Sequence, residues 1–166
     1  FENENPAFDA FSRPKLFLTS FFQSAVTRTA GFYTIPLSKL SSTSKAVSMV
    51  LMFIGGASGS TAGGIKVGTF AVIMIAMAAT IRGKNSFVVF GRRISLNNVL
   101  RAMGILAVGI AIVSISTLLI CLAEPQLLFA DVLYEVISAF ATVGQTLGIT
   151  PYLTVFSKGI IILLMF

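Results

Sequence analysis

The sequence predicts an all-α polytopic membrane protein, in which short re-entrant helices alternate with longer apolar ones. Only 11% of the 166 residues are charged and 55% are hydrophobic, whereas soluble domains carry about 25% charged residues. Residues 102–123 contain no charged side chain, and a helix needs about 20 apolar residues to cross a bilayer. Low charge and one charge-free run of spanning length therefore indicate a membrane environment.

The charged residues are segregated along the chain, which predicts its orientation. Residues 82–101 contain five basic residues and no acidic one. The acidic residues lie in two other regions: Glu2, Glu4 and Asp9, and then Glu124, Asp131 and Glu135. Short loops rich in Lys and Arg usually remain in the cytoplasm, so residues 82–101 are expected inside and both acidic regions outside. Nucleic-acid binding is the weaker interpretation of the net charge of +6, because apolar segments flank the basic loop.

Two apolar segments are too short or too charged to span. Residues 16–26 form an apolar run of 11 residues, and residues 127–141 include Asp131 and Glu135. Runs of this length are typical of re-entrant or buried helices, and carboxylates facing lipid are costly. Both segments are expected to enter from the outside, cross half the membrane and turn back. The two carboxylates solvate the outer end of a helix or raise the local cation concentration.

A glycine-rich string interrupts what would otherwise be one long apolar helix. Residues 46–54 and 67–81 are apolar, but residues 55–64 read GGASGSTAGG. Each glycine weakens a helix by about 1 kcal/mol relative to Ala. Irregular backbone at membrane depth persists only when protein or a water-filled cavity surrounds it. The sequence therefore predicts an inner helix broken by an intramembrane loop that faces a pathway.

The chain also resembles itself at an offset of 113 residues. This shift aligns Thr29 with Thr142 and Gly31 with Gly144, and it aligns the Ser-Lys pair at 44–45 with that at 157–158. The common unit is a short apolar helix, a Thr-x-Gly turn, a polar stretch and an inner helix. Such spacing predicts an internal duplication.

The two Thr-x-Gly turns are the best candidates for a functional site. Each follows the expected C-terminus of a half-crossing helix, where the helix dipole favours a cation. Glycine accepts left-handed backbone angles, which would let successive carbonyl oxygens point one way. A ring of such oxygens can replace the hydration shell of a potassium ion. The alternative is a purely structural role, in which Gly31 and Gly144 are ordinary helix C-cap glycines.

Three motifs in order carry a resemblance to a known family. TRTAGF, GGASGSTAGGIK and FATVGQTLGITPYLT resemble the Trk/Ktr/HKT superfamily of potassium transporters, most closely the bacterial KtrB-type membrane subunit. The resemblance implies repeats of outer helix, pore helix with filter loop, and inner helix. Residues 1–81 would be a third repeat lacking its first helix, residues 82–95 a cytoplasmic basic loop, and residues 96–166 a fourth repeat truncated in its inner helix.

The resemblance also implies the site residues. The filter positions would be Thr29, Ala30, Gly31, Phe32, Thr142, Val143, Gly144 and Gln145. The gate loop would comprise Gly55, Gly56, Gly59, Ser60, Thr61, Gly63 and Gly64, followed by Lys66. Gln145 departs from the Leu more usual at its position, so the resemblance leaves the selectivity of the outer site open.

The implied function is potassium uptake across the plasma membrane, with sodium as a possible second ion and no covalently bound cofactor. The implied partners are the lipid bilayer, a second copy of the chain and a cytoplasmic nucleotide-binding regulatory ring. An enzyme is not expected, because the sequence has no His and no acidic pair within an apolar span. A sodium-selective member of the superfamily and a non-conducting assembly subunit are the alternatives.

Three residue roles stay open in the sequence. The small residues 55–64 could be a close helix-packing patch; a phosphate loop is excluded because the string lacks a Gly-Lys-Ser/Thr ending and a preceding strand. Lys66 either snorkels toward the cytoplasm or anchors the loop, as an intramembrane charge suggests. Arg28 is expected to brace the first short helix behind its turn, since a bare cation in the pathway would repel potassium.

Overall fold

The computed structural model describes residues 13–28, 30–33, 36–60, 62–83, 88–89 and 92–166 of the chain. The described residues are mostly helical. The elements are α1 (Arg13–Val26), η2 (Leu37–Lys39), α2 (Ser42–Phe53), α3 (Val67–Ile81), β1 (Val88–Val89), β2 (Arg92–Arg93), α4 (Leu96–Ala123), α5 (Phe129–Phe140), η3 (Thr150–Tyr152) and α6 (Val155–Leu164).

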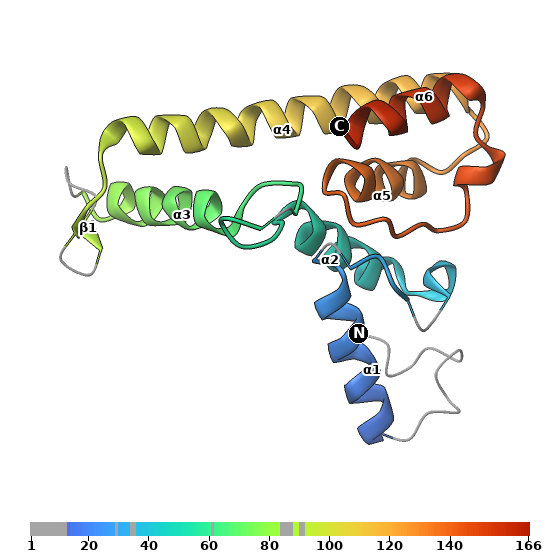
Figure 1. Ribbon diagram of the computed structural model, residues 1–166, viewed down its shortest axis with the longest axis horizontal. Helices are drawn as coiled ribbons and strands as arrows, with labels where there is room; N and C mark the ends of the chain where they lie inside the picture. The colour runs from blue at the N-terminus through green and yellow to red at the C-terminus, as the bar shows by residue number, and fades with distance from the viewer. Residues whose placement is uncertain (1–12, 29, 34–35, 61, 84–87, 90–91) are drawn as a thin grey trace.

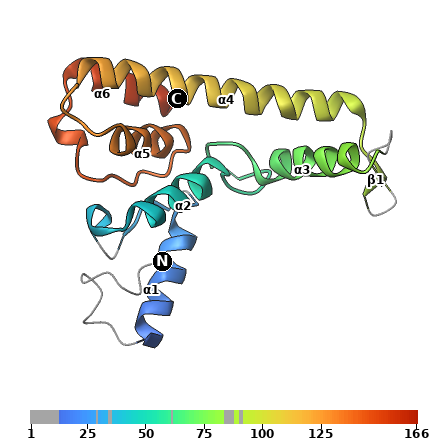
Figure 2. The same cartoon turned by 180° about the vertical axis from the view of Figure 1, so that it is seen from behind.

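The long helix α4 is the scaffold on which the other elements are arranged. It packs against α3 near its beginning and against α5 and α6 near its end, and α5 also packs against α2. Figure 1 shows α3 along one half of α4 and α6 along the other half, with α5 below α6 and α2 below the middle of the molecule. Helix α1 leads away from this group, as Figure 2 shows from behind.

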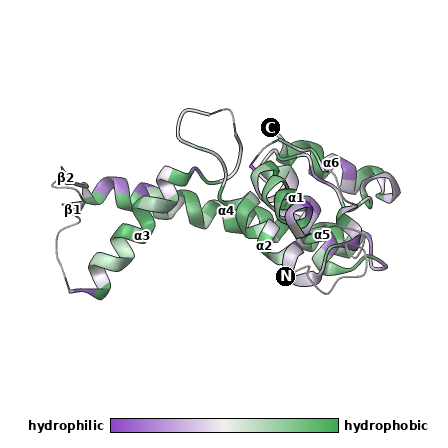
Figure 3. Ribbon diagram, turned by 90° about the horizontal axis from the view of Figure 1, so that it is seen from below, coloured by the Kyte–Doolittle hydropathy of each residue, from purple (hydrophilic) through white to green (hydrophobic). Residues whose placement is uncertain are grey.

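Helix α4 has the length and composition expected of a membrane span. Among the described residues it is the one helix long and apolar enough to cross a membrane, whereas α3 and α6 are shorter apolar helices. Large apolar side chains are exposed along it, from Leu100 at 57% to Leu122 at 78%, and Figure 3 shows its hydrophobic colouring. Contiguous exposed apolar surface marks contact with lipid or with further protein.

The two short helices form where the apolar runs predicted them. Helix α1 has 14 residues and α5 has 12, so at 1.5 Å per residue each reaches only part of the way across a bilayer. Helix α5 strongly segregates buried and exposed faces, and seven of its residues are buried. One of the two Thr-x-Gly sequences follows each of these helices along the chain.

The glycine-rich string breaks the inner helix as predicted. Helix α2 ends at Phe53 and α3 begins at Val67. Ser41 caps the start of α2 by accepting a hydrogen bond from the Ser44 amide at 3.2 Å, a preferred N-cap arrangement. The residues between α2 and α3 form a folded loop, which Figure 1 shows between the ends of the two helices.

The fold is helical, as predicted, with one small hairpin that the sequence did not suggest. Strands β1 and β2 pair antiparallel within the basic loop, with Val88 opposite Arg93 and Val89 opposite Arg92. Each strand has only two residues, which is too short for an alternating pattern to predict it. The hairpin joins α3 to the start of α4.

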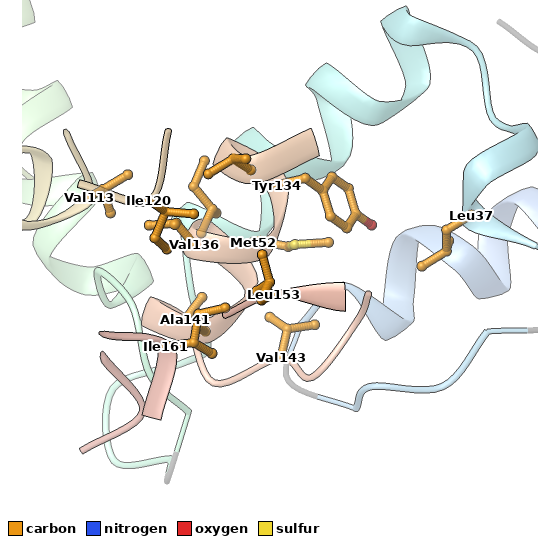
Figure 4. Packing of buried hydrophobic residues seen from close by; sticks show 13 residues of the cluster. Leu37, Met52, Val113, Ile120, Tyr134, Val136, Ala141, Val143, Leu153 and Ile161 are labelled. Carbon is orange, nitrogen blue, oxygen red and sulfur yellow. The ribbon is translucent and has the colours of Figure 1, made fainter. Parts of the chain in front are cut away.

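The core lies where α2, the end of α4, α5 and α6 meet. Met52 of α2, Ile120 of α4 and Tyr134 of α5 are at most 1% exposed, and Figure 4 shows Met52 among residues of α5 and the segment after it. Val143 belongs to the same cluster and is 3% exposed. The second Thr-x-Gly turn is therefore held by the best-packed part of the molecule.

Candidate functional site

The two glycine turns, defined as residues 27–32 (first) and 141–145 (second), lie against each other. Gly31 has φ +72° and Gly144 has φ +81°, both in the left-handed region that glycine adopts without strain. A Cβ placed on Gly31 would lie 2.6 Å from the carbonyl oxygen of Val143 and 3.9 Å from the Cα of Gly144. The two backbones are in contact, so no side chain fits at residue 31.

Neither glycine is the cap of its preceding helix. At the end of α5 the Val143 amide donates to the Ser138 carbonyl at 2.9 Å, and the Thr142 amide donates to the Ala139 carbonyl at 3.0 Å. This is the Schellman pattern, and its left-handed position is Thr142, at φ +53°. Gly144 lies two residues beyond, and Gly31 lies five residues after the end of α1. The helix-cap interpretation of these glycines is therefore wrong.

The left-handed conformation of Thr142 is unusual. For a β-branched residue it is a genuine outlier, costing about 1–2 kcal/mol, and such outliers gather at functional sites. The hydroxyl of Thr142 accepts a hydrogen bond from the Gly63 amide at 2.9 Å. This bond joins the glycine-rich loop to the first residues of the second turn.

The glycine-rich loop, residues 55–66, is closed at its neck by backbone hydrogen bonds. The Gly55 amide donates to the Ile65 carbonyl at 2.8 Å, and the Ile65 amide donates to the Phe53 carbonyl at 3.1 Å. The Val67 amide donates to the Gly56 carbonyl at 3.2 Å. A Cβ on Gly55 would lie 2.1 Å from the Gly63 carbonyl oxygen. The neck therefore requires glycine because its two strands touch.

The loop also packs directly against the second turn. A Cβ on Gly63 would lie 2.7 Å from the Thr142 hydroxyl and 2.8 Å from the Ala141 carbonyl carbon, and one on Gly64 would lie 3.4 Å from the Ala141 side chain. Gly64 is left-handed, with φ +68°. The small residues thus serve close contact between this loop and the second turn, a more specific role than helix packing.

Lys66 bonds to the loop that precedes it. Its ammonium group donates to the Ser60 carbonyl at 2.7 Å and to the Ala62 carbonyl at 2.8 Å. The Ser60 hydroxyl donates in turn to the Ala57 carbonyl at 2.8 Å. Of the two roles open for Lys66, the geometry fits an anchor for the loop.

Gln145 connects the two turns through its side chain. It is 1% exposed. Its Nε2 donates to the Phe32 carbonyl at 3.2 Å, and its Oε1 accepts from the Tyr134 hydroxyl at 3.0 Å. Phe32 and Gln145 are aligned by the 113-residue offset, which is the signal that could have suggested their pairing.

Glu135 has a role that the sequence did not reveal. The expectation that it solvates a helix end is wrong, since it is only 6% exposed. Its carboxylate accepts hydrogen bonds from the Thr146 hydroxyl, from the Leu147 amide at 3.1 Å and from the Thr150 hydroxyl at 3.1 Å. It therefore braces the segment that follows the second turn from inside the protein.

The other two carboxylates of this region also have partners. Asp131, at the start of α5, pairs with Lys45 of α2 at 3.5 Å, a partly exposed contact of the kind that contributes about 0–1 kcal/mol. Glu124 ends α4 and accepts from the Thr154 amide at 2.7 Å and the Ser157 hydroxyl at 3.4 Å. These carboxylates tie α5 to α2 and the end of α4 to the start of α6.

Hydrogen bonds from the Thr154 amide and hydroxyl hold the pKa of Glu124 below its ordinary value. The ionised form is thus favoured in the folded state, as expected for an anion at the N-terminus of α6. A lowered folded pKa adds stability above the unfolded pKa of about 4.3, and this contribution is lost as pH falls through the folded pKa.

We expect Glu124→Gln to lower the thermal stability of the full-length protein in detergent at pH 7. The difference from the unsubstituted protein should persist down to about pH 5 and shrink below about pH 4. Melting curves across this pH range measure it. A difference that does not change with pH would contradict the role of the carboxylate charge. Gln126→Ala is the comparison variant: it removes one neutral donor to Glu124 at 3.2 Å but keeps the carboxylate with its bonds from Thr154 and Ser157, so it should lower stability by less.

Two of the predicted site residues, Thr29 and Thr61, lie outside the described residues. Ala30 precedes Gly31, and its amide donates to the Val26 carbonyl at 3.3 Å. Arg28 is exposed and its amide donates to the Ala25 carbonyl at 3.2 Å; its bracing role stays a prediction. In the part of the chain that the structure covers, no cluster of three His, Cys, Asp or Glu side chains could hold a metal.

Comparison with known proteins places the chain in a family. Residues 4–166 match the TrkH family, described as cation transport protein. The chain belongs to this family. The membership confirms the resemblance to the Trk/Ktr superfamily that the three motifs carried, and it agrees with the prediction that the chain is not an enzyme.

Relatives of this TrkH-family chain are named as uptake proteins. It is 40% identical over 150 residues to the potassium/sodium uptake protein NtpJ of Enterococcus hirae. It is 39% identical over 147 residues and 42% over 148 residues to the Ktr system potassium uptake proteins B of Bacillus subtilis and Vibrio alginolyticus. These matches cover 89% of the chain but only 33%, 33% and 32% of the relatives. The chain therefore spans about a third of their length.

Proposed function

We propose that this chain supplies two consecutive pore-loop repeats of a potassium-uptake protein. Residues 1–81 would be the third repeat, residues 82–95 a cytoplasmic loop and residues 96–166 the fourth. The observation that carries the proposal is the contact between the two glycine turns, where a Cβ on Gly31 would lie 2.6 Å from the Val143 carbonyl oxygen. Relatives named for potassium or potassium and sodium uptake support the choice of ion.

The ion would pass between backbone carbonyls of the two turns and their counterparts in other repeats. Carbonyl oxygens at Thr29 to Phe32 and at Thr142 to Gln145 would replace water around potassium. Left-handed glycines within both turns support this arrangement. The cation needs no resident cofactor, and sodium remains the alternative cargo.

The glycine-rich loop would be the gate. Its hydrogen bond from Gly63 to Thr142 and its close packing on Ala141 support a position next to the second turn. The bonds from Lys66 to Ser60 and Ala62 would hold the closed form. Movement of the loop would break the Thr142 bond and leave that hydroxyl available to the ion.

The same proposal assigns the surroundings of the protein. The exposed apolar side chains of α4 would face lipid or other repeats in the plasma membrane, with residues 82–101 in the cytoplasm and the turns facing outside. A homodimer on a cytoplasmic nucleotide-binding ring is the assembly proposed from the family resemblance.

The test is potassium uptake by the full-length protein in cells that lack their own uptake systems. Uptake should saturate with potassium concentration, and Gly144→Ser should reduce the preference for potassium over sodium by about tenfold, since a left-handed serine distorts the carbonyl ring. Gly159→Ala is the control, because no atom lies within 4 Å of the Cβ that it adds. An unchanged preference at normal protein abundance would favour an assembly subunit.

A further inference from the structure

The side chain of Gln145 is buried against the carbonyl oxygen of the residue that occupies the same place in the other half of the chain. Its Nε2 lies 3.2 Å from the Phe32 carbonyl oxygen, and its Oε1 lies 3.0 Å from the Tyr134 hydroxyl. A carbonyl can only accept, so the amide nitrogen must face Phe32 and the amide oxygen must face Tyr134. The orientation of the amide is thereby fixed.

Burial and two hydrogen bonds restrain this side chain. Gln145 is 1% exposed and Tyr134 is 0% exposed. A buried amide that lost its partners would cost about 1–3 kcal/mol, which holds both hydrogen bonds in place. Tyr134 belongs to α5, Gln145 to the second turn and Phe32 to the first. The chain Tyr134–Gln145–Phe32 therefore transmits the position of a packed helix to the backbone of the opposite turn.

We propose that Gln145 is a positioning residue that determines ion specificity, by fixing and partly neutralising the Phe32 carbonyl at the outer end of the pathway. This inference rests on the proposed function of the two turns. A carbonyl oxygen that already accepts an N–H offers an ion a weaker field, and one that is tethered cannot move inward around a smaller ion. Selectivity among alkali ions depends on both the number and the field strength of such oxygens.

A purely structural role would have a different signature. It would change the abundance of the protein in the membrane, or the maximal uptake rates of potassium and sodium together. The positioning role changes the ratio of the potassium and sodium KM values, because it acts on one coordinating oxygen. The ratio of KM values, measured beside membrane abundance, therefore separates the two roles.

The experiment uses the full-length protein in uptake-deficient cells, with potassium and sodium as the probes. Gln145→Met keeps the approximate length of the side chain, and Gln145→Leu keeps its apolar bulk; both remove the N–H donor to the Phe32 carbonyl without adding a charge. We expect each variant to shift the ratio of KM values toward sodium by about fivefold, because the released Phe32 carbonyl offers a stronger field and can move inward around the smaller ion. Fivefold corresponds to the free energy of about one hydrogen bond. Tyr134→Phe, which keeps Gln145 but frees its amide, should change the ratio in the same direction and by less.

The outcomes are distinguishable. If Gly144→Ser alters the ratio but the Gln145 variants leave it unchanged, the inference is overturned and the proposed function stands. If Gly144→Ser also leaves it unchanged, the proposed function itself fails. Should both Gln145 variants fail to reach the membrane, Tyr134→Phe decides: a shifted ratio supports the inference, and an unshifted ratio overturns it.

Discussion

Replacing Gly31 by alanine should remove most of the discrimination between potassium and sodium. The substitution forces a residue with a Cβ into φ +72° and places that Cβ 2.6 Å from the Val143 carbonyl oxygen. The left-handed conformation alone costs about 1–2 kcal/mol, and contacts below 3.0 Å require one backbone to move. Because both turns would shift, we expect a loss of at least about tenfold in preference.

Competitive uptake of potassium and sodium by cells expressing the full-length variant measures this loss. Gly159→Ala in α6 is the matched control, since it adds the same methyl group where nothing lies within 4 Å. A Gly31→Ala protein that reaches the membrane and retains its preference would contradict the idea that the two turns share one ion pathway.

Replacing Gly55 by alanine should open the proposed gate. The added Cβ would lie 2.1 Å from the Gly63 carbonyl oxygen, which the neck of the glycine-rich loop cannot accommodate. Displacing Gly63 breaks its hydrogen bond to Thr142. Since the loop would obstruct the path in its present position, we expect potassium flux to rise by about tenfold or more. This corresponds to a closed conformation that is less stable by about 1.4 kcal/mol.

Rubidium flux into proteoliposomes containing the full-length protein measures the effect without other cellular components. Gly104→Ala is the control, because Gly104 lies in α4 with no atom within 4 Å of the Cβ that alanine would add. Flux that falls, with the protein correctly inserted, would show that the loop supports conduction instead of blocking it.

The positions of the helices along the chain could be predicted, because they depend on local composition. Five glycines in ten residues break any helix, so the interruption between α2 and α3 followed from the sequence. The charge-free run that became α4 and the short run that became α1 were equally visible. Helix α4 begins six residues earlier than the charge-free run, since Arg101 at its exposed side needs no apolar partner.

The contacts within the candidate site could not be predicted, because they depend on which way side chains turn after the chain has folded. The sequence marked Gln145 as a departure from the family pattern but said nothing of its bond to Phe32. The donors that surround Glu135 lie 11 to 15 residues further along the chain. Thr142, not a glycine, occupies the left-handed cap of α5, a choice that propensity disfavours.

A Cβ at residue 31 would collide with a main-chain oxygen. This limits which second substitutions could compensate for a change at residue 31. A steric conflict between two side chains can be relieved by trimming either of them. The carbonyl of Val143 is present whatever residue stands at that position, so no exchange at residue 143 supplies the missing space. Genetic suppressors of a lesion at residue 31 should therefore be revertants to glycine, and the two halves of the chain cannot diverge independently at this point.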